Sequence, residues 1–281
     1  MTRLIRLARE AWHALYGLWF AAVVLVCVPV TLLLVTVLPG LGRRRAAARN
    51  GARLLFLATG MGPGIDNRRH LPGRPCVVVA NHASYLDGII LCAALPPRFA
   101  FVIKSEMQRV PLAHYLLRRI GAQFVERFHH GRSARDARTI LRRAHVGESL
   151  AFFPEGTFHA EPGLRRFRGG AFAVAVKAQA PLVPAVIHGS RHALPSSRLL
   201  PRPQRLRVTL LEPIDTAGQT PASLATLSRT RILAHLDEPD LHPAAETPVP
   251  REDGRDETRA GTEAPADAGT EARGPAGIQR L

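Results

Sequence analysis

Cysteine and aromatic residues are scarce in this chain of 281 residues. Only 3 cysteines occur, Cys27, Cys76 and Cys92, with no C-x-x-C pair, which excludes a disulfide-stapled scaffold and a zinc ribbon. Aromatic residues make up 6%, too few for the mixed basic and aromatic surfaces of nucleic-acid binders, so we expect no nucleic-acid partner. Hydrophobic residues reach 46%, which excludes general disorder. The composition is that of a globular protein of one or two domains.

Acidic charge is scarce too, except near the end of the chain. Residues 237–281 hold 5 Arg and 11 acidic residues, which leaves residues 1–236 with a net charge of +22. The strongly basic part should bind anionic partners, such as a membrane surface or a phosphorylated substrate. Residues 237–281 are rich in Pro, Ala, Gly and acidic residues and have almost no large apolar side chains. We therefore predict that they form a disordered tail.

A run of 29 residues without charge extends from Ala14 to Gly42. As a helix it would span about 43 Å, more than the roughly 30 Å of a bilayer's hydrocarbon core. It is also too long for the apolar segment of a cleavable signal peptide. We interpret residues 1–42 as an amphipathic and hydrophobic membrane anchor. Pro29 divides the apolar run and predicts a kink or a turn, because proline removes a helical hydrogen bond.

Arginine clusters flank this hydrophobic run on both sides. Two membrane arrangements remain open: a helical hairpin that dips into one leaflet and keeps both clusters on one anionic surface, and a tilted membrane span. A buried helix in a soluble core is the other alternative. The larger cluster follows the run, so either membrane arrangement leaves the rest of the chain on the cytoplasmic face of the cell inner membrane. The clusters are Arg3, Arg6 and Arg9 before the run, and Arg43, Arg44, Arg45, Arg49 and Arg53 after it.

Residues 43–236 alternate between short β-rich runs and helical stretches. This alternation predicts an α/β domain in which helices flank a central mixed sheet. Ligands of such domains bind at loops beyond the strand ends. We expect strands at 77–80, 99–104, 122–128, 149–153, 182–188 and 206–211, and helices at 87–95, 112–119, 133–145, 170–179 and 223–236.

The segment NHASYLD, residues 81–87, directly follows the strand expected at 77–80. His82 and Asp87 stand five residues apart, so they would lie on different faces of one helix, and the loop must turn to bring them together. Asp87 could then hold one ring nitrogen of His82 while the other takes a proton from a substrate hydroxyl. Alone, the spacing is weak evidence, because a surface histidine and a helix-capping aspartate would look the same.

The segment FFPEGTF, residues 152–158, ends another expected strand and precedes a basic stretch. Glu155 could accept a hydrogen bond from a substrate hydroxyl, while Thr157 and the glycine amides could donate to an anion. Lys104 and Arg127, each at the end of a further strand, could hold a phosphate from two sides. An ordinary turn and solvated charges would explain each of these features when taken singly.

In this order the two segments, the basic block between them and the proline-containing strand at 182–187 resemble the 1-acyl-sn-glycerol-3-phosphate acyltransferase (lysophospholipid acyltransferase) family. The resemblance covers about residues 76–190, and the pairing of NHASYLD with FFPEGTF carries it. It implies a glycerolipid-acyltransferase-like fold and an O-acyltransferase. The enzyme would transfer a fatty acyl group from acyl-CoA or acyl carrier protein to the free hydroxyl of a lysophospholipid, converting 1-acyl-sn-glycerol-3-phosphate to phosphatidic acid.

By this resemblance His82 is the general base, Asp87 orients it, and Glu155 and Gly156 help bind the acceptor. Arg127 is the implied phosphate ligand. No metal and no cofactor are implied beyond the acyl-CoA or acyl carrier protein cosubstrate, and membrane phospholipids are the implied surroundings. The candidate substrate-binding residues are Glu155, Gly156, Thr157, Arg127, Lys104 and Arg168.

Phe158 departs from the family pattern, in which arginine more often follows FPEGT. This departure leaves open another acceptor, such as lysophosphatidylethanolamine or lyso-ornithine lipid. Arg168 before Gly169 keeps the positive charge that many relatives place there as lysine. A thioesterase with water as acceptor would use the same base. A non-catalytic lipid-binding relative is the remaining alternative.

Overall fold

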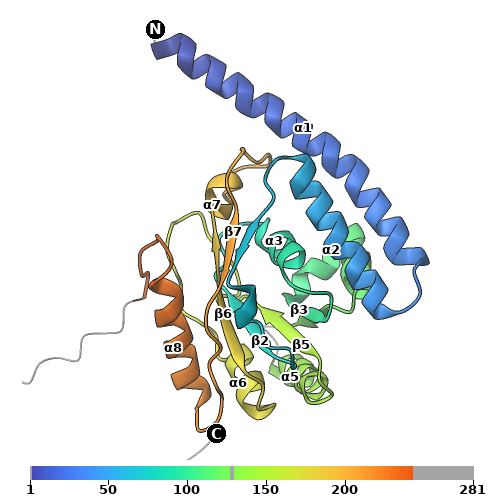
Figure 1. Ribbon diagram of the computed structural model, residues 1–281, viewed down its shortest axis with the longest axis vertical. Coiled ribbons are helices and arrows are strands. Elements are labelled where there is room, and N and C mark those ends of the chain that lie inside the picture. Colours follow the sequence, from blue (N-terminus) through green and yellow to red (C-terminus); the bar gives the residue numbers. More distant parts are fainter. Residues whose placement is uncertain (1, 127–129, 243–281) are drawn as a thin grey trace, which may run out of the picture. The chain divides into compact units, whose positions relative to one another are not determined.

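A single mixed β-sheet lies at the centre of the computed structural model, which describes residues 2–126 and 130–242 (Figure 1). In this part of the chain seven strands follow the order β1-β7-β6-β2-β5-β3-β4. β6, β2, β5, β3 and β4 run parallel, whereas β7 is antiparallel to β6 and parallel to β1. The carboxyl ends of the five parallel strands therefore share one edge. The strands are β1 Gly64–Asp66, β2 Val77–Ala80, β3 Phe99–Lys104, β4 Gln123–Val125, β5 Ser149–Phe152, β6 Leu182–His188 and β7 Arg207–Leu210.

Helices cover both faces of this sheet, and the pattern of β2 shows why. Val78 and Ala80 belong to an apolar cluster with α1, α2 and α3, whereas Val77 and Val79 belong to one with α5, α6 and α8. A parallel strand buried on both faces needs a continuous apolar run instead of alternation. The helices are α1 Thr2–Val37, α2 Leu41–Ala58, α3 Asp87–Ala94, α4 Pro111–Arg119, α5 His130–His145, α6 Gly170–Lys177, α7 Ser190–Ala193 and α8 Pro221–Leu233, with 3₁₀ turns η1 Arg68–His70 and η2 Ser105–Arg109.

The predicted mixed sheet with flanking helices is confirmed, with differences at particular elements. β4 covers Gln123–Val125 of the strand expected at 122–128, whose last two residues lie outside the described residues. α8 begins two residues early, because Thr220 and Ser223 form a capping box in front of it. β1 was not expected, because Gly60, Gly62 and Gly64 leave no apolar run there that would indicate a strand. It forms by pairing with β7, about 140 residues later in the chain.

Of the kink or turn expected at Pro29, the turn is absent. α1 continues through Pro29, and the chain turns only at residues 38–40, before α2. Pro29 lies on the exposed side of α1, while Val23 and Cys27 before it and Val35 after it are buried. Packing on both sides of the proline therefore holds the helix together despite the lost hydrogen bond, a cost of about 3 kcal/mol.

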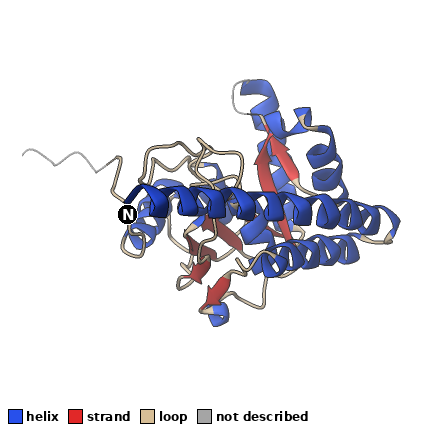
Figure 2. Ribbon diagram, turned by 90° about the horizontal axis from the view of Figure 1, so that it is seen from above, coloured by secondary structure: helices blue, strands red, loops and turns tan. Residues whose placement is uncertain are grey.

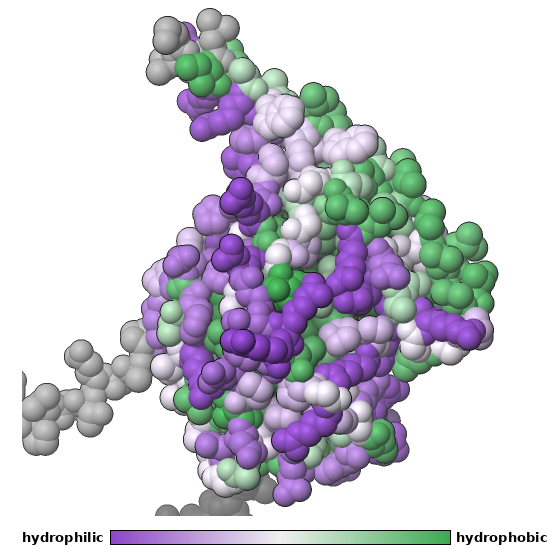
Figure 3. All heavy atoms as spheres, viewed as in Figure 1, coloured by the Kyte–Doolittle hydropathy of each residue, from purple (hydrophilic) through white to green (hydrophobic). Residues whose placement is uncertain are grey.

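α1 and α2 form an antiparallel pair along one side of the α/β domain (Figure 2). The Tyr16 hydroxyl donates to the Thr59 carbonyl (2.8 Å), while Arg44 Nε near the start of α2 donates to the Leu38 carbonyl (2.9 Å). Among the described helices, α1 over Ile5–Val37 is long and apolar enough to cross a membrane, and only 22% of its most apolar window is buried. Figure 3 shows these apolar side chains gathered along α1.

The described residues, 2–126 and 130–242, lie within one compact unit. The predicted disorder of the tail beyond residue 242 falls outside the described residues. Its first residues are described, and they contact the domain: the Leu164 amide donates to the Pro239 carbonyl (2.9 Å), and the Leu241 amide donates to the Leu164 carbonyl (3.2 Å). The structured part of the chain therefore extends beyond residue 236, where the sequence placed the domain boundary.

Candidate active site

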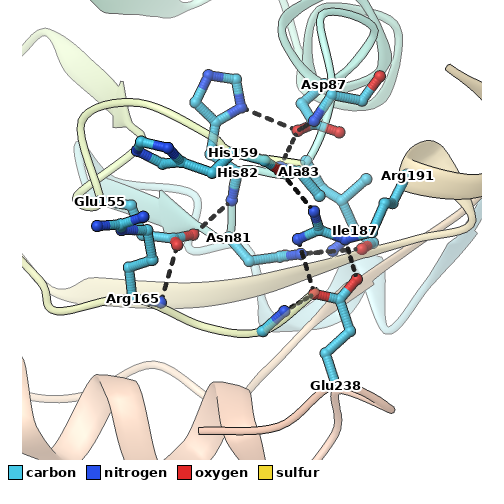
Figure 4. Close-up of polar contacts among 12 residues, drawn as sticks. Asn81, His82, Ala83, Asp87, Glu155, His159, Arg165, Ile187, Arg191 and Glu238 are labelled. Atoms are coloured by element: carbon cyan, nitrogen blue, oxygen red, sulfur yellow. Dashed lines mark hydrogen bonds and ion pairs between the residues drawn. The ribbon is translucent and has the colours of Figure 1, made fainter. Parts of the chain in front are cut away.

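Two segments far apart in the sequence meet at the carboxyl edge of the parallel strands (Figure 4). β2 and β5 are adjacent and parallel, so the loops after them leave the sheet side by side. These loops carry His82 and Glu155, which are 73 residues apart in sequence. β3 lies on the other side of β5 and ends at Lys104. This edge is where open α/β sheets bind their ligands, and it is the candidate active site.

His82 and Asp87 are in direct contact across a tight turn. His82 Nδ1 lies 2.9 Å from Asp87 Oδ2, which also accepts hydrogen bonds from the Ala83 amide (2.6 Å) and the Ser84 amide (2.8 Å). Asp87 is the first residue of α3 and is completely buried. The turn that the five-residue spacing requires therefore forms, and two backbone amides lock the carboxylate in position.

The contact with Asp87 assigns the tautomer of His82. An ionised carboxylate can only accept, so the Nδ1–H group donates a hydrogen bond to Asp87 Oδ2. In the neutral imidazole this tautomer leaves a lone pair on Nε2. The imidazole is 17% exposed. The ring is thus fixed in orientation and has one nitrogen ready to accept a proton.

Aromatic rings surround His82 on two sides. Phe153 stacks on the imidazole with a centroid distance of 4.3 Å, and Phe158 meets it edge-on at 4.7 Å. Tyr85, which is 65% exposed, packs edge-on against Phe158 at 4.7 Å. Phe158, the residue that departs from the family pattern, is therefore part of the immediate surroundings of His82.

Glu155 joins the two loops through its carboxylate. Oε1 accepts from the His82 amide (2.7 Å), and Oε2 accepts from the Arg165 amide (3.0 Å). Glu155 is 6% exposed, and burial raises its pKa to about 7, although both amide hydrogen bonds and the charge of Arg191 act to lower it. Both oxygens are bonded to backbone, so the structure gives Glu155 a clear function in holding the loops.

Residues around Glu155 shape the same loop. Gly156 is buried and adopts a left-handed backbone conformation, with φ of 85°, which favours glycine, and its amide donates to the Phe153 carbonyl (3.0 Å). Thr157 next to it is half-buried. The chain therefore turns sharply directly after Glu155.

The predicted cationic residues are less tightly connected to this centre. Lys104 is half-buried at the end of β3, and the Arg168 side chain is exposed, while its amide donates to the Pro154 carbonyl (2.9 Å). Arg127 lies outside the described residues. Within residues 2–126 and 130–242, no group of three or more His, Cys, Asp or Glu side chains could hold a metal ion.

Sequence reasoning missed residues that hold the site from behind. The Asn81 side chain exchanges two hydrogen bonds with the Ile187 backbone, at 3.1 and 2.7 Å, and ties the end of β2 to β6. No contact was predicted for Asn81, although a buried polar residue that follows a strand needs a hydrogen-bond partner. The roles of Arg165 and Arg191 could not be predicted from the sequence, because they depend on contacts with residues that are distant in sequence.

Comparison with known proteins agrees with this geometry. Residues 64–188, from β1 to the end of β6, match the family model described as Acyltransferase. Over these residues the chain is similar to the acyltransferase family. The match contains the His82 and Glu155 loops, so the segments that meet in the structure are the ones inside the family domain.

Relatives and a solved structure extend the comparison. Human 1-acyl-sn-glycerol-3-phosphate acyltransferase beta is 32% identical over 172 residues, 59% of this chain and 60% of that protein. Lyso-ornithine lipid O-acyltransferase of Pseudomonas aeruginosa is 34% identical over 174 residues, 55% of this chain and 65% of that protein. The chain thus spans about three fifths of these relatives. The crystal structure of the 1-acyl-sn-glycerophosphate acyltransferase PlsC from Thermotoga maritima has a TM-score of 0.70 at 21% identity, covers 81% of this chain and 95% of that one, and shows the same fold.

Proposed function

We propose that this protein is an O-acyltransferase that moves a fatty acyl group from acyl-CoA or acyl carrier protein to the free hydroxyl of 1-acyl-sn-glycerol-3-phosphate, forming phosphatidic acid. One observation carries the proposal: His82 Nδ1 is bound to a fully buried Asp87, which leaves Nε2 of a partly exposed imidazole as a base. The family match and the human relative support the reaction class and the acceptor.

The reaction requires a single displacement. Nε2 of His82 takes the proton from the acceptor hydroxyl while the oxygen attacks the thioester carbonyl, and Asp87 stabilises the imidazolium that forms. The tetrahedral intermediate then collapses, the C–S bond breaks, and the thiolate leaves with the proton from His82. The ester forms without an acyl-enzyme, because a thiolate is a good leaving group. General base catalysis of this kind supplies about 10²- to 10⁴-fold in rate.

The anionic groups of the substrates need cationic side chains to bind them. Lys104 at the end of β3, Arg168 after the Glu155 loop and Arg127 are assigned to the acceptor phosphate in this proposal. The Gly156 amide is already bonded to the Phe153 carbonyl, so in this proposal Gly156 shapes the loop and the Thr157 hydroxyl is the group assigned to donate to the acceptor. We assign Glu155 to positioning instead of direct acceptor binding, because backbone amides occupy both of its oxygens.

A second acceptor class is favoured by Phe158. Its ring lies edge-on to His82, where an arginine would place a cation near the acceptor. The Pseudomonas relative is named for an acyl transfer to lyso-ornithine lipid. A lysolipid such as lyso-ornithine lipid or lysophosphatidylethanolamine is therefore the alternative acceptor.

The membrane association suggested by α1 is proposed here in a definite form, a helix that lies along the surface of the inner membrane's cytoplasmic leaflet. α1 packs lengthwise on the domain, from Tyr16, which bonds the Thr59 carbonyl, to the fully buried Val35. Arg119 donates to the Val35 and Thr36 carbonyls at the end of α1. If α1 spanned the membrane perpendicularly, Arg119 would be drawn into the hydrocarbon, at a cost of several kcal/mol.

The outward side of α1 fits such a surface. From Ala11 onward its exposed residues are apolar except for Thr36. Leu199, 95% exposed, precedes Leu200, whose side chain lies against Gly17 of α1. Burying such a face in lipid gains about 25 cal/mol per Å² of apolar area. The exposed large apolar residues of α1 are Ile5, Leu7, Trp12, Leu15, Leu18, Trp19, Leu25, Val26, Val30, Leu33, Leu34 and Val37.

The test is acyl transfer by the full-length protein purified in detergent. A radiolabelled acyl thioester, as acyl-CoA and as acyl carrier protein, is offered with lysophosphatidate, lysophosphatidylethanolamine, lyso-ornithine lipid and water alone, with His82→Ala in parallel. Product from lysophosphatidate that the variant does not form supports the proposal. Product only from another lysolipid keeps the mechanism and changes the acceptor, free fatty acid alone indicates a thioesterase, and lipid binding without turnover indicates a non-catalytic relative.

A further inference from the structure

Residues 238–241, here called the strap, cross the loop that follows the Glu155 turn. The Leu164 amide donates to the Pro239 carbonyl (2.9 Å) and its carbonyl accepts from the Leu241 amide (3.2 Å), so strap and loop pair like two short strands. Gly163 has a φ of 134°, and a Cβ atom there would lie 2.8 Å from the Pro239 carbonyl oxygen. Glycine is therefore needed at this position for the strap to approach the loop.

Two arginines fasten the ends of the strap. Arg191 of α7 binds both carboxylate oxygens of Glu238, at 2.7 and 2.8 Å, and donates to the His159 carbonyl at 2.8 Å (Figure 4). Glu238 also accepts from the Gly163 amide (2.8 Å). Arg229 of α8 binds both carboxylate oxygens of Asp240. Each arginine thus connects a strap carboxylate, through a bidentate pair, with a rigid helix.

From the strap, hydrogen bonds continue without a gap to His82. Arg229 Nε donates to the Arg165 carbonyl (3.2 Å), and the Arg165 amide donates to Glu155 Oε2 (3.0 Å). The other oxygen of Glu155 accepts from the His82 amide (2.7 Å). The loop itself has no helix or strand between residues 153 and 169, and residues 159–162 are exposed. The strap supports it together with Leu164 and Phe167, which are buried in the apolar core.

We propose that the strap is a positioning device for the base of the site, and that Arg229, Asp240, Arg191 and Glu238 are positioning residues that act through Arg165 and Glu155 on His82. This inference rests on the proposed function for its kinetic consequence. None of these four residues needs to touch substrate. They fix the loop that carries the Glu155 bond, and a displacement of about 1 Å at such a base can cost about 100-fold in rate.

The kinetic test uses Arg229→Gln in the full chain, with Arg231→Gln as the matched control. Arg231 lies on the same helix, two residues on, and donates to the Glu212 carbonyl, away from the strap. We expect Arg229→Gln to lower kcat about 10-fold with the acceptor KM within about 2-fold, and Arg231→Gln to change neither. Equal effects of the two substitutions would contradict a positioning function.

A double-mutant cycle separates positioning from general destabilisation. If Arg229 acts through the Glu155 bond, Arg229→Gln should cost almost nothing further in a Glu155→Gln background, whereas independent effects multiply. A repeated 10-fold loss in the double variant would overturn the proposed route.

Hydrogen exchange tests the same connection without substrate, so its result does not depend on the acyl transfer proposal. In Arg229→Gln and Asp240→Asn we expect faster amide exchange in peptides covering residues 156–166 and 82–86, and unchanged exchange in α4. Arg231→Gln should leave all three regions unchanged. Faster exchange confined to α8 and the strap would show that the connection does not reach His82 and would overturn the inference.

Discussion

The two sides of the candidate site lie at one edge of the sheet, yet their side chains are held very differently. On the side of His82, Asp87 and Glu155 are buried, and their carboxylates bind backbone amides of two loops. On the basic side, Lys104 is half-buried and Arg168 is exposed. Proton transfer needs groups fixed to within fractions of an ångström, while a headgroup phosphate can be bound by mobile surface cations. Under the proposed function, this difference separates the residues assigned to proton transfer from those assigned to binding the phosphate.

The largest effect on activity is expected at His82 itself. His82→Ala removes the proposed base and should lower kcat by about 10²- to 10⁴-fold, measured with the labelled thioester assay. Binding of the variant to anionic vesicles should equal that of the unchanged protein, which serves as the control. Activity within about 3-fold of the original would show that the site does not work through His82.

Asp87→Asn should have the next largest effect, about 10²-fold on kcat, because a neutral amide stabilises the imidazolium less than a carboxylate. The asparagine oxygen can still accept from the Ala83 and Ser84 amides, so the thermal midpoint should change little. Asp215→Asn, at an exposed aspartate outside the site, is the control. A large loss of stability with a proportionate loss of activity would indicate a purely structural Asp87.

Glu155→Gln should change the pH dependence of stability. Burial raises the pKa of Glu155 from 4.5 to about 7, so between these pH values the folded protein keeps a proton that the unfolded chain has lost. The carboxyl group therefore makes the fold less stable as pH rises from about 4.5 to about 7, by roughly 3 kcal/mol over that range.

The neutral glutamine lacks this contribution. Thermal midpoints measured at pH 5 and pH 7.5 should show the original protein losing stability relative to Glu155→Gln as pH rises. A constant difference between the two proteins would mean that Glu155 is not buried as described, or that Asp87 and Arg191 beside it compensate its titration.

The smallest effects belong to the basic side. Lys104→Ala and Arg168→Ala should each raise the acceptor KM about 3- to 5-fold with kcat unchanged, since a partly solvated cation contributes about 1 kcal/mol to binding a phosphate. The increase should shrink at high salt, where the charges are screened. A change in kcat without a change in KM would group these residues with His82, Asp87 and Glu155, and the difference between the two sides of the site would disappear.

The sequence alone was sufficient for the features that depend on neighbouring residues. The buried strand at 77–80 follows from a continuous apolar run. The five-residue spacing showed that a turn is needed to bring His82 to Asp87, and the structure shows that this turn forms. The alternation of elements predicted a mixed sheet, and local spacing and apolar patterning are sufficient for such a prediction. The similarity to the acyltransferase family came instead from the resemblance of NHASYLD and FFPEGTF to known motifs, and the family model matches residues 64–188.

Only the tertiary structure decided the rest, because distant residues supply the deciding contacts. Packing against α2 keeps α1 continuous through Pro29, against the local preference of proline. β1 exists through its pairing with β7, and Glu155 bonds to loops on either side of it instead of facing solvent. The strap folds onto the loop through Arg191 and Arg229, although its composition predicts disorder. Propensity is a weak, local preference, and buried hydrogen bonds and packing between distant segments outweigh it.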